Sequence, residues 1–348
     1  MIHWRIWAAV MLTVLWAAVP SSDGQGVQGG YWEDGVYCIE CFEGLEELGR
    51  MVERSEGAFT GQVRLMRDIE AVRPLKPIGS LKHMFCGTFD GGGHTISNLS
   101  VQGTGEFEGL FGYVGNGGIV RDLTLHGMRV AGARCTGGIA AYSSGRIERC
   151  RVEAGRIIGL GRVRYGTATG GVVGLSNGEL IECVNRDTRV EGGRCVGGVV
   201  GKQCAGSVER CANTGSVHAR DEAEALCGGV AGSLQTGASM RSCVNTGRIF
   251  APRGTWVGGV TGGLLGGGMI GCISTGEIHA REAGGAIGYA ARRAQVMCCV
   301  YAGRPYPGVG EGRQDGMFIL PGDEKRLGRA YELLRPLIEN KEHRGAMP

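Results

Sequence analysis

Cysteine is the residue type whose spacing most suggests chemistry in this chain, which has 14 cysteines among 348 residues. One pair, Cys38 and Cys41, has the C-x-x-C spacing of a zinc or redox site. A zinc site would need two more ligands, and the sequence has no second pair of this kind. A redox motif would need a strand–helix junction inside a β-α-β unit, which we do not expect here. The pair is therefore predicted to be structural, as a local disulfide or as buried thiols.

Six further cysteines occupy one equivalent position of a repeat, and Leu99 and Leu123 align with them in the two earliest units. These six cysteines are Cys150, Cys183, Cys211, Cys243, Cys272 and Cys299. Free cysteine is among the most buried residue types, and here it takes the place of leucine, so we predict an inward-facing packing column. Stacked residues on parallel neighbours seldom have disulfide geometry. No metal or cofactor is expected from this column.

Other candidate catalytic or metal-binding groups are sparse. Asp90 and His94 lie close together in FDGGGHTI, but the glycines between them indicate a turn more than a catalytic pair. His218 and His279 share one repeat position, and Phe250 stands between them, which argues against a metal site. Acids within the expected strands are matched by arginines or replaced by glycine in the next unit. We therefore predict no catalytic residues and no metal ligands.

The elements that must position these residues come from the repeat itself. VGGVVGKQCAGSVERCANTGSV, which starts at Val196, recurs in related form from Thr136, Thr169, Cys227 and Val257, at a period of roughly 30 residues. Each unit holds short β-branched runs bounded by glycine and asparagine, which are typical of strands. A unit this small must stack on its neighbours to bury its apolar side chains. We predict an all-β solenoid, a right-handed parallel β-helix of about eight coils with capping helices at both ends.

Asparagines accompany the cysteine column. Asn185, Asn213 and Asn245 each follow a column cysteine by two positions, and Ser274 takes the same place in the next unit. Because asparagine tolerates turns and can bond to a neighbouring amide, we predict an amide ladder on the turn side of the coils.

The amino-terminal part divides into two segments. Residues 1–22 have a basic lead and a short apolar run, which indicates a signal peptide and hence a secreted or cell-surface protein; an uncleaved anchor is the alternative. Residues 23–84 are predicted to form a strand and an amphipathic helix over 42–54 that closes the open end of the solenoid. No further membrane span is expected once the signal peptide is removed.

Residues 78–112 contain FDGGGHTISNL, and later units contain ERCANTGSV and RSCVNTGRI, each followed by a Gly-Gly-apolar stretch. These motifs resemble the GLUG-motif β-helix family of bacterial secreted and surface proteins, which includes a region of immunoglobulin-A metalloproteases. The resemblance covers roughly Gly35–Gly303 and implies a β-helix scaffold that adhesins and enzymes share. The chain lacks the HExxH zinc motif, so the resemblance does not imply protease activity.

The β-helix is predicted over residues 85–303, followed over 304–348 by a connector and a helix from Asp323 to Glu342. That helix would cap the last coil or dock a partner. Loops of variable length between units are candidate ligand-binding surfaces. Their basic and aromatic side chains are Arg162, Arg164, Tyr165, Arg253 and Trp256. Cys195 and Cys227, at the ends of two such loops, are the best candidates for a disulfide.

The sequence is compatible with two classes of function. The first is a non-enzymatic extracellular binding or adhesion module that presents loops to a glycan or protein ligand at the cell surface. The second is a glycan-active β-helix enzyme, a lyase or hydrolase, which would need clustered carboxylates on one face. Net charge of +3 and the lack of a basic run with interleaved aromatics argue against nucleic-acid binding. We favour the binding module.

Overall fold

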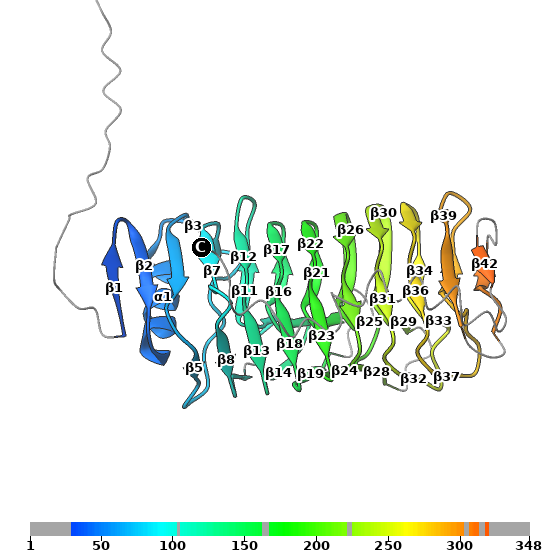
Figure 1. Cartoon of the computed structure of the whole chain (residues 1–348), viewed down its shortest axis with the longest axis horizontal. Coiled ribbons are helices and arrows are strands. Elements are labelled where there is room, and N and C mark those ends of the chain that lie inside the picture. Colours follow the sequence, from blue (N-terminus) through cyan, green and yellow to red (C-terminus); the bar gives the residue numbers. More distant parts are fainter. Residues whose placement is uncertain are drawn as a thin grey trace, which may run out of the picture.

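The computed structural model describes residues 29–102, 105–161, 167–220, 225–302, 306–312 and 317–319. These residues form an elongated β-solenoid of about nine turns, in which successive coils lie side by side along one axis (Figure 1). The predicted signal peptide and the predicted C-terminal helix lie outside the described residues. The right-handed winding stays a prediction.

Four sheets run along the axis, and nearly all of their strand pairs are parallel; we call them sheets A to D. Sheet A has 19 strands within the described residues. They are β1 (Gly30–Glu33), β2 (Val36–Ile39), β3 (Ala58–Phe59), β4 (Gln62–Leu65), β6 (Met84–Phe85), β7 (Thr88–Asp90), β11 (Phe111–Val114), β12 (Ile119–Arg121), β16 (Ala140–Ser143), β17 (Arg146–Glu148), β21 (Val173–Ser176), β22 (Glu179–Ile181), β26 (Val200–Glu209), β30 (Ala231–Arg241), β34 (Thr261–Leu264), β35 (Gly268–Ile270), β38 (Ile287–Ala290), β39 (Gln295–Met297) and β41 (Val309–Gly312).

The other three sheets receive one strand from each coil that reaches them. Sheet B contains β5 (Ile69–Glu70), β8 (Thr95–Ser97), β13 (Thr124–His126), β18 (Arg151–Glu153), β23 (Val184–Arg186), β27 (Ala212–Asn213), β31 (Val244–Asn245), β36 (Ile273–Ser274), β40 (Cys299–Tyr301) and β42 (Met317–Ile319). Sheet C contains β9 (Ser100–Gln102), β14 (Arg129–Gly132), β19 (Arg156–Gly159), β24 (Arg189–Gly192), β28 (Ser216–Ala219), β32 (Ile249–Ala251) and β37 (Ile278–Ala280). Sheet D contains β10 (Phe107–Glu108), β15 (Cys135–Gly137), β20 (Ala168–Gly170), β25 (Cys195–Gly197), β29 (Leu226–Gly228) and β33 (Trp256–Gly258).

One helix, α1 (Phe42–Arg54), occurs among the described residues and lies at the amino-terminal end of the solenoid (Figure 1). It spans the residues expected to be helical and buries Leu45, Leu48 and Val52, whereas Met51 is partly buried. Parallel pairing already begins beside it, since β2 pairs with β4 and β4 with β7. The solenoid ladder thus extends into segment 23–84, and the role of α1 as a cap stays a prediction.

The Gly-Gly signature of each repeat has a steric cause. The second glycine faces the inward residue of sheet B, and a Cβ at Gly171 would lie 2.7 Å from Cγ of Asn185. At Gly138 the same added atom would lie 2.7 Å from a methyl carbon of Val152. Real Cβ atoms do not approach other atoms so closely, so only glycine fits between these sheets. The repeat therefore needs glycine here for close packing.

Candidate functional site

All six predicted column cysteines are buried, each with at most 1% of its surface exposed. Their thiols donate to backbone carbonyls, for example Cys183 Sγ to the Ile147 oxygen at 3.3 Å and Cys211 Sγ to the Glu209 oxygen at 3.3 Å. Burial raises the pKa of Cys150 to about 12, so this thiol stays protonated at neutral pH. All 14 cysteines are free, and no group of three metal-binding side chains occurs among the described residues. The column is placed for packing.

The residue before each column position has left-handed backbone, although it is rarely glycine. These residues, with φ between 49° and 55°, are Asp122, Arg149, Glu182, Arg210, Ser242 and Cys298. Left-handed backbone costs a residue with a Cβ roughly 1–2 kcal/mol, so the tight corner is held by the surrounding ladders. Sequence inspection missed this feature because arginine and glutamate are not typical of such corners.

Leu99 does not belong to the column, contrary to the expectation from sequence. The register pairs Thr95 with Thr124, so His94 is the equivalent of Leu123. Leu99 instead precedes β9 and aligns with Met128 before β14. The extra glycines of FDGGGHTI shifted the sequence alignment, so that Leu99, which lies at the next corner of the coil, was matched with the cysteine column.

The asparagines form a buried ladder inside sheet B rather than on its turns, which corrects the prediction of a turn-side ladder. Asn185 Nδ2 donates to Asn213 Oδ1 at 2.7 Å, and Asn213 Nδ2 donates to Asn245 Oδ1 at 2.8 Å. All three residues are fully buried. At the same register position, earlier coils carry Leu125 and Val152. The core column thus changes from apolar to amide along the axis.

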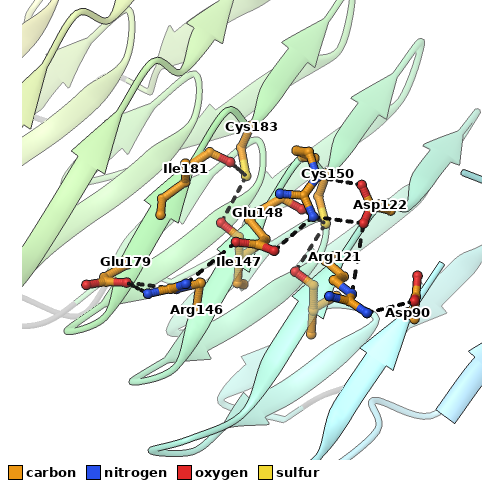
Figure 2. A network of polar contacts seen from close by, with 12 residues as sticks. Asp90, Arg121, Asp122, Arg146, Ile147, Glu148, Cys150, Glu179, Ile181 and Cys183 are labelled. Carbon is orange, nitrogen blue, oxygen red and sulfur yellow. Dashed lines mark hydrogen bonds and ion pairs between the residues drawn. The ribbon is translucent and has the colours of Figure 1, made fainter. Parts of the chain in front are cut away.

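Charged residues follow the surface of sheet A and its corners beside the cysteine column (Figure 2). Arg149 bonds to Asp122 at 2.7 Å and to Glu148 at 2.9 Å, and Arg210 bonds to Glu182 at 2.9 Å. These side chains are between an eighth and a half exposed, so each pair contributes only about 0–1 kcal/mol. The acids are occupied by arginines, as expected for a structural salt ladder.

The Cys38–Cys41 pair lies in a setting that the sequence did not predict. The parallel strands β2 and β4 flank α1 in sequence, so the pair does sit at a strand–helix junction of a β-α-β unit. Burial raises the pKa of both thiols, and Cys41 Sγ donates to Glu43 Oε2 at 3.0 Å. A reactive cysteine needs a basic environment that favours thiolate. The junction is redox-like in topology, but its acids favour the inert thiol.

Asp90 and His94, the candidate catalytic pair, make contacts that hold a turn. Asp90 Oδ2 accepts from Arg121 Nη2 at 2.9 Å, and its Oδ1 accepts from the Gly92 N–H at 2.9 Å. His94 Nδ1 lies 3.4 Å from Asp68. These contacts fit a turn held by hydrogen bonds.

The two histidines of sheet C have the predicted neighbour. His218 pairs in register with Phe250, and Phe250 pairs with His279, with ring centroids 5.8 and 6.3 Å apart. The phenyl ring separates the two imidazoles, which excludes a metal ion shared between them.

The candidate ligand-facing residues are only partly described. Arg162, Arg164 and Tyr165 lie outside the described residues. Arg253 is exposed on a turn after β32. Trp256 is not in a loop but is the first residue of β33, and its ring stacks on Tyr289 at 4.4 Å and 17°. Its indole Nε1 donates to Glu311 Oε2 at 3.1 Å.

The expected disulfide between Cys195 and Cys227 does not form. Cys195 pairs in register with Leu226, so Cys227 is offset by one residue and points to the other face of sheet D. Cys195 packs with Cys135 and Leu226, whereas Cys227 packs in a separate apolar cluster toward sheet C.

Trp256 belongs to a longer feature, in which one face of sheet D meets the outer face of sheet A. We call it the D–A corner. Its residues are, on sheet D, Phe107, Cys135, Ala168, Cys195, Leu226 and Trp256, and, on sheet A, Tyr113, Tyr142, Leu175, Lys202, Ser233, Gly263 and Tyr289.

Each sheet D residue of the corner contacts sheet A of the next coil. The rings of Phe107 and Tyr142 lie 6.3 Å apart at 80°, and Cys195 Sγ lies 3.7 Å from Ser233 Oγ. Tyr142 also stacks on Tyr113 at 4.4 Å and 13°. Partly exposed aromatic rings therefore frame a strip of mostly small and apolar residues at both ends. Sequence inspection missed this strip because its partners come from different coils.

The architecture defines a class of β-solenoid with known members. A proposed immunoglobulin A1 protease from Bacteroides ovatus has a solved structure that matches with a TM-score of 0.58, over 85% of this chain and 87% of that chain. Sequence identity is 15%, so the likeness concerns the fold alone.

Two proteins are similar in sequence over shorter stretches. Halomucin from Haloquadratum walsbyi is 37% identical over 98 residues, and a protein from Evansella cellulosilytica named as a Gly-rich membrane protein is 36% identical over 84 residues. These matches cover 28% and 23% of this chain but span only 1% and 10% of the relatives' own lengths. No protein-family model matches the chain, so the GLUG resemblance stays a prediction. None of the helices in the described part of the chain has the length and apolar character needed to cross a membrane.

Proposed function

We propose that this chain is a non-catalytic binding module of an exported protein and that its D–A corner holds an extended glycan. The observation that carries the proposal is the pair of aromatic groups at the two ends of the corner. Trp256 and Tyr289 stack at one end, and Tyr113 and Tyr142 stack at the other. All four rings remain partly exposed.

Ring faces of this kind suit the C–H face of a sugar. Tyrosine and tryptophan offer a flat apolar surface together with a polar hydrogen-bonding group, as an amphipathic ligand requires. From Phe107 to Trp256 the corner spans five strand-to-strand steps, or about 24 Å at about 4.8 Å per step. The middle carries the partly exposed Lys202, whose ammonium group can bond to sugar hydroxyl groups. The corner thus fits several linked sugars lying along the axis.

Several observations support an extracellular setting without catalysis. Residues 1–22 have the pattern of a signal peptide, and one relative is named as a membrane protein. The fold is that of a proposed immunoglobulin A1 protease. Asp90, the acid of the candidate catalytic pair, is occupied by Arg121 and a backbone N–H. A stiff solenoid that displays aromatic rings at both ends of one corner suits adhesion to a glycan surface.

The test is a glycan-array screen of the full chain, followed by calorimetry with the best ligand. Trp256→Ala and Tyr113→Ala should each weaken binding by about ten-fold, because a stacked ring contributes about 0.5–1.5 kcal/mol beyond the area it buries. Trp32→Ala is the matched control, since Trp32 is 43% exposed on β1, away from the corner. Unchanged affinity in the corner variants would refute the site. Release of reducing sugar from any bound glycan would refute the non-catalytic assignment.

A further inference from the structure

The outer face of sheet C carries a row of arginines that the binding proposal above does not use. Arg129, Arg156 and Arg189 stand directly opposite one another on β14, β19 and β24. Adjacent strands lie about 4.8 Å apart, so three guanidinium groups start from neighbouring points on one face. Like charges placed directly opposite in a sheet repel one another. The row therefore concentrates positive charge along the axis.

Acidic side chains compensate only one end of this row. Glu191 lies 3.3 Å from Arg189 and 3.7 Å from Arg156, and it also lies 3.3 Å from Arg220. One carboxylate is thus shared by three guanidinium groups. Arg129 is exposed and contacts no carboxylate among the described residues. Positive charge remains unbalanced at the Arg129 end.

A groove of about 640 Å³ lies at that same end. Arg129 and Arg156 line it, together with Ala131 and Ile158, which are partly exposed between them. Asn98 lies at its margin and donates its amide to Glu70 at 3.4 Å. The groove thus pairs two cationic side chains with a small apolar surface.

We propose that this groove binds a linear acidic glycan, with Arg129 and Arg156 each holding a carboxylate or sulfate group. Arginine presents a planar fork of donors that matches such oxyanions. A sugar residue in an extended chain is close in length to the spacing between coils, so successive anionic sugars can meet successive arginines. Ala131 and Ile158 then contact the apolar face of the ring.

A glycan fits this groove better than an acidic peptide does. A peptide that adds to a sheet needs the free backbone groups of an edge strand. The arginine row lies on the face of sheet C, whose strands β14 and β19 are paired on both sides. In naming a glycan, the proposal rests on the function proposed above. Its residues lie on a different sheet from the D–A corner, so each site is tested by its own variants.

The experiment titrates the full chain with a short oligogalacturonate, with its methyl ester, and with a sulfated oligosaccharide of equal length. Oligogalacturonate should bind and its neutral ester should not. Arg129→Gln should weaken binding by about ten-fold to a hundred-fold, because each charge-assisted bond is strong, and Arg129→Lys should retain part of the affinity. Binding should fall between ionic strengths of about 0.01 M and about 1 M as the charges are screened. Tighter binding of the sulfated ligand would support the site and identify sulfate as its anion.

Arg50→Gln, at an exposed position of α1, is the matched control that removes the same charge elsewhere. It should leave oligogalacturonate affinity unchanged, and so should Trp256→Ala in the D–A corner. Equal affinity of Arg129→Gln and the unmodified chain would overturn the proposal, as would equal binding of the methyl ester. Tighter binding of a polyglutamate peptide would overturn the glycan assignment. Absence of binding at low ionic strength would overturn the site itself.

Discussion

Replacing one amide of the buried asparagine ladder should destabilise the solenoid strongly. Asn213 accepts from Asn185 Nδ2 at 2.7 Å and donates both to Asn245 Oδ1 at 2.8 Å and to the Gly215 oxygen at 3.1 Å. In Asn213→Val the Asn185 Nδ2 group and the Gly215 oxygen lose these partners while they remain buried, whereas Asn245 Oδ1 keeps its bond from the Gly247 N–H at 3.1 Å. Each unsatisfied buried group costs about 1–3 kcal/mol, so the pair should cost about 2–6 kcal/mol. That is a large share of the about 5–15 kcal/mol that stabilises a typical protein.

The matched control removes the whole ladder. With Asn185, Asn213 and Asn245 all changed to valine, no side-chain amide is left unpaired within this column. Valine fits the position, since Val152 occupies it one coil earlier against Gly138. The triple variant should therefore lose several kcal/mol less than the sum of its three single variants.

Urea unfolding followed by circular dichroism gives the overall loss, and native-state hydrogen exchange around β27 locates it. A cost below about 1 kcal/mol for Asn213→Val would refute the reasoning. Strict additivity of the three single variants would refute it as well, since the amides would then act independently.

Three further predictions address other buried positions. Cys211→Ser should destabilise by about 1–3 kcal/mol in urea unfolding, because it puts a hydroxyl in an apolar column, and rapid alkylation of native Cys211 would show instead that it faces solvent. Gly198→Ala should destabilise strongly, because its Cβ would overlap the Asn213 side chain, whereas an added Cβ at Gly49 in α1 meets nothing within 4 Å, so Gly49→Ala should stabilise by up to about 1 kcal/mol; equal effects would contradict the steric account. Burial raises the pKa of Glu108, whose Oε2 has no partner among the described residues, so the folded chain holds this proton to higher pH than the unfolded chain. Stability should therefore fall as pH rises from about 4.5, the unfolded pKa, through the raised folded pKa, and Glu108→Gln should remove that fall in melting temperature; an unchanged pH profile would contradict it.

The sequence predicted the architecture because the repeat determines it. Glycine pairs and short apolar runs at one period require stacked coils, and the buried cysteine column follows from the same alignment. The position of α1 was predicted too, since the apolar spacing over 42–54 is helical. The alignment failed where the coil length changes, as at Leu99, because two extra residues in the glycine turn after Asp90 moved the register.

The candidate binding surfaces were much harder to predict. Loop composition drew attention to Trp256, but its partner Tyr289 comes from the next coil, and the spacing of repeats does not reveal that offset. Similarly, Arg129, Arg156 and Arg189 stand in register only because the strands of sheet C pair as they do. The disulfide expected between Cys195 and Cys227 failed for a similar reason. The two cysteines are offset by one residue in the register, and neighbouring residues of a strand face opposite sides of the sheet. Such pairings depend on three-dimensional offsets between coils.

The offset at the D–A corner also affects how the solenoid unfolds. In a simple repeat protein each unit touches its neighbours through one stack of ladders, so end units can fray alone. Here each sheet D strand also lies against sheet A of the following coil, as the contact between Cys195 and Ser233 shows. Opening one coil therefore breaks a ladder and a lateral contact together. This double coupling raises cooperativity, so the central coils should unfold as one block while fraying is confined to the ends.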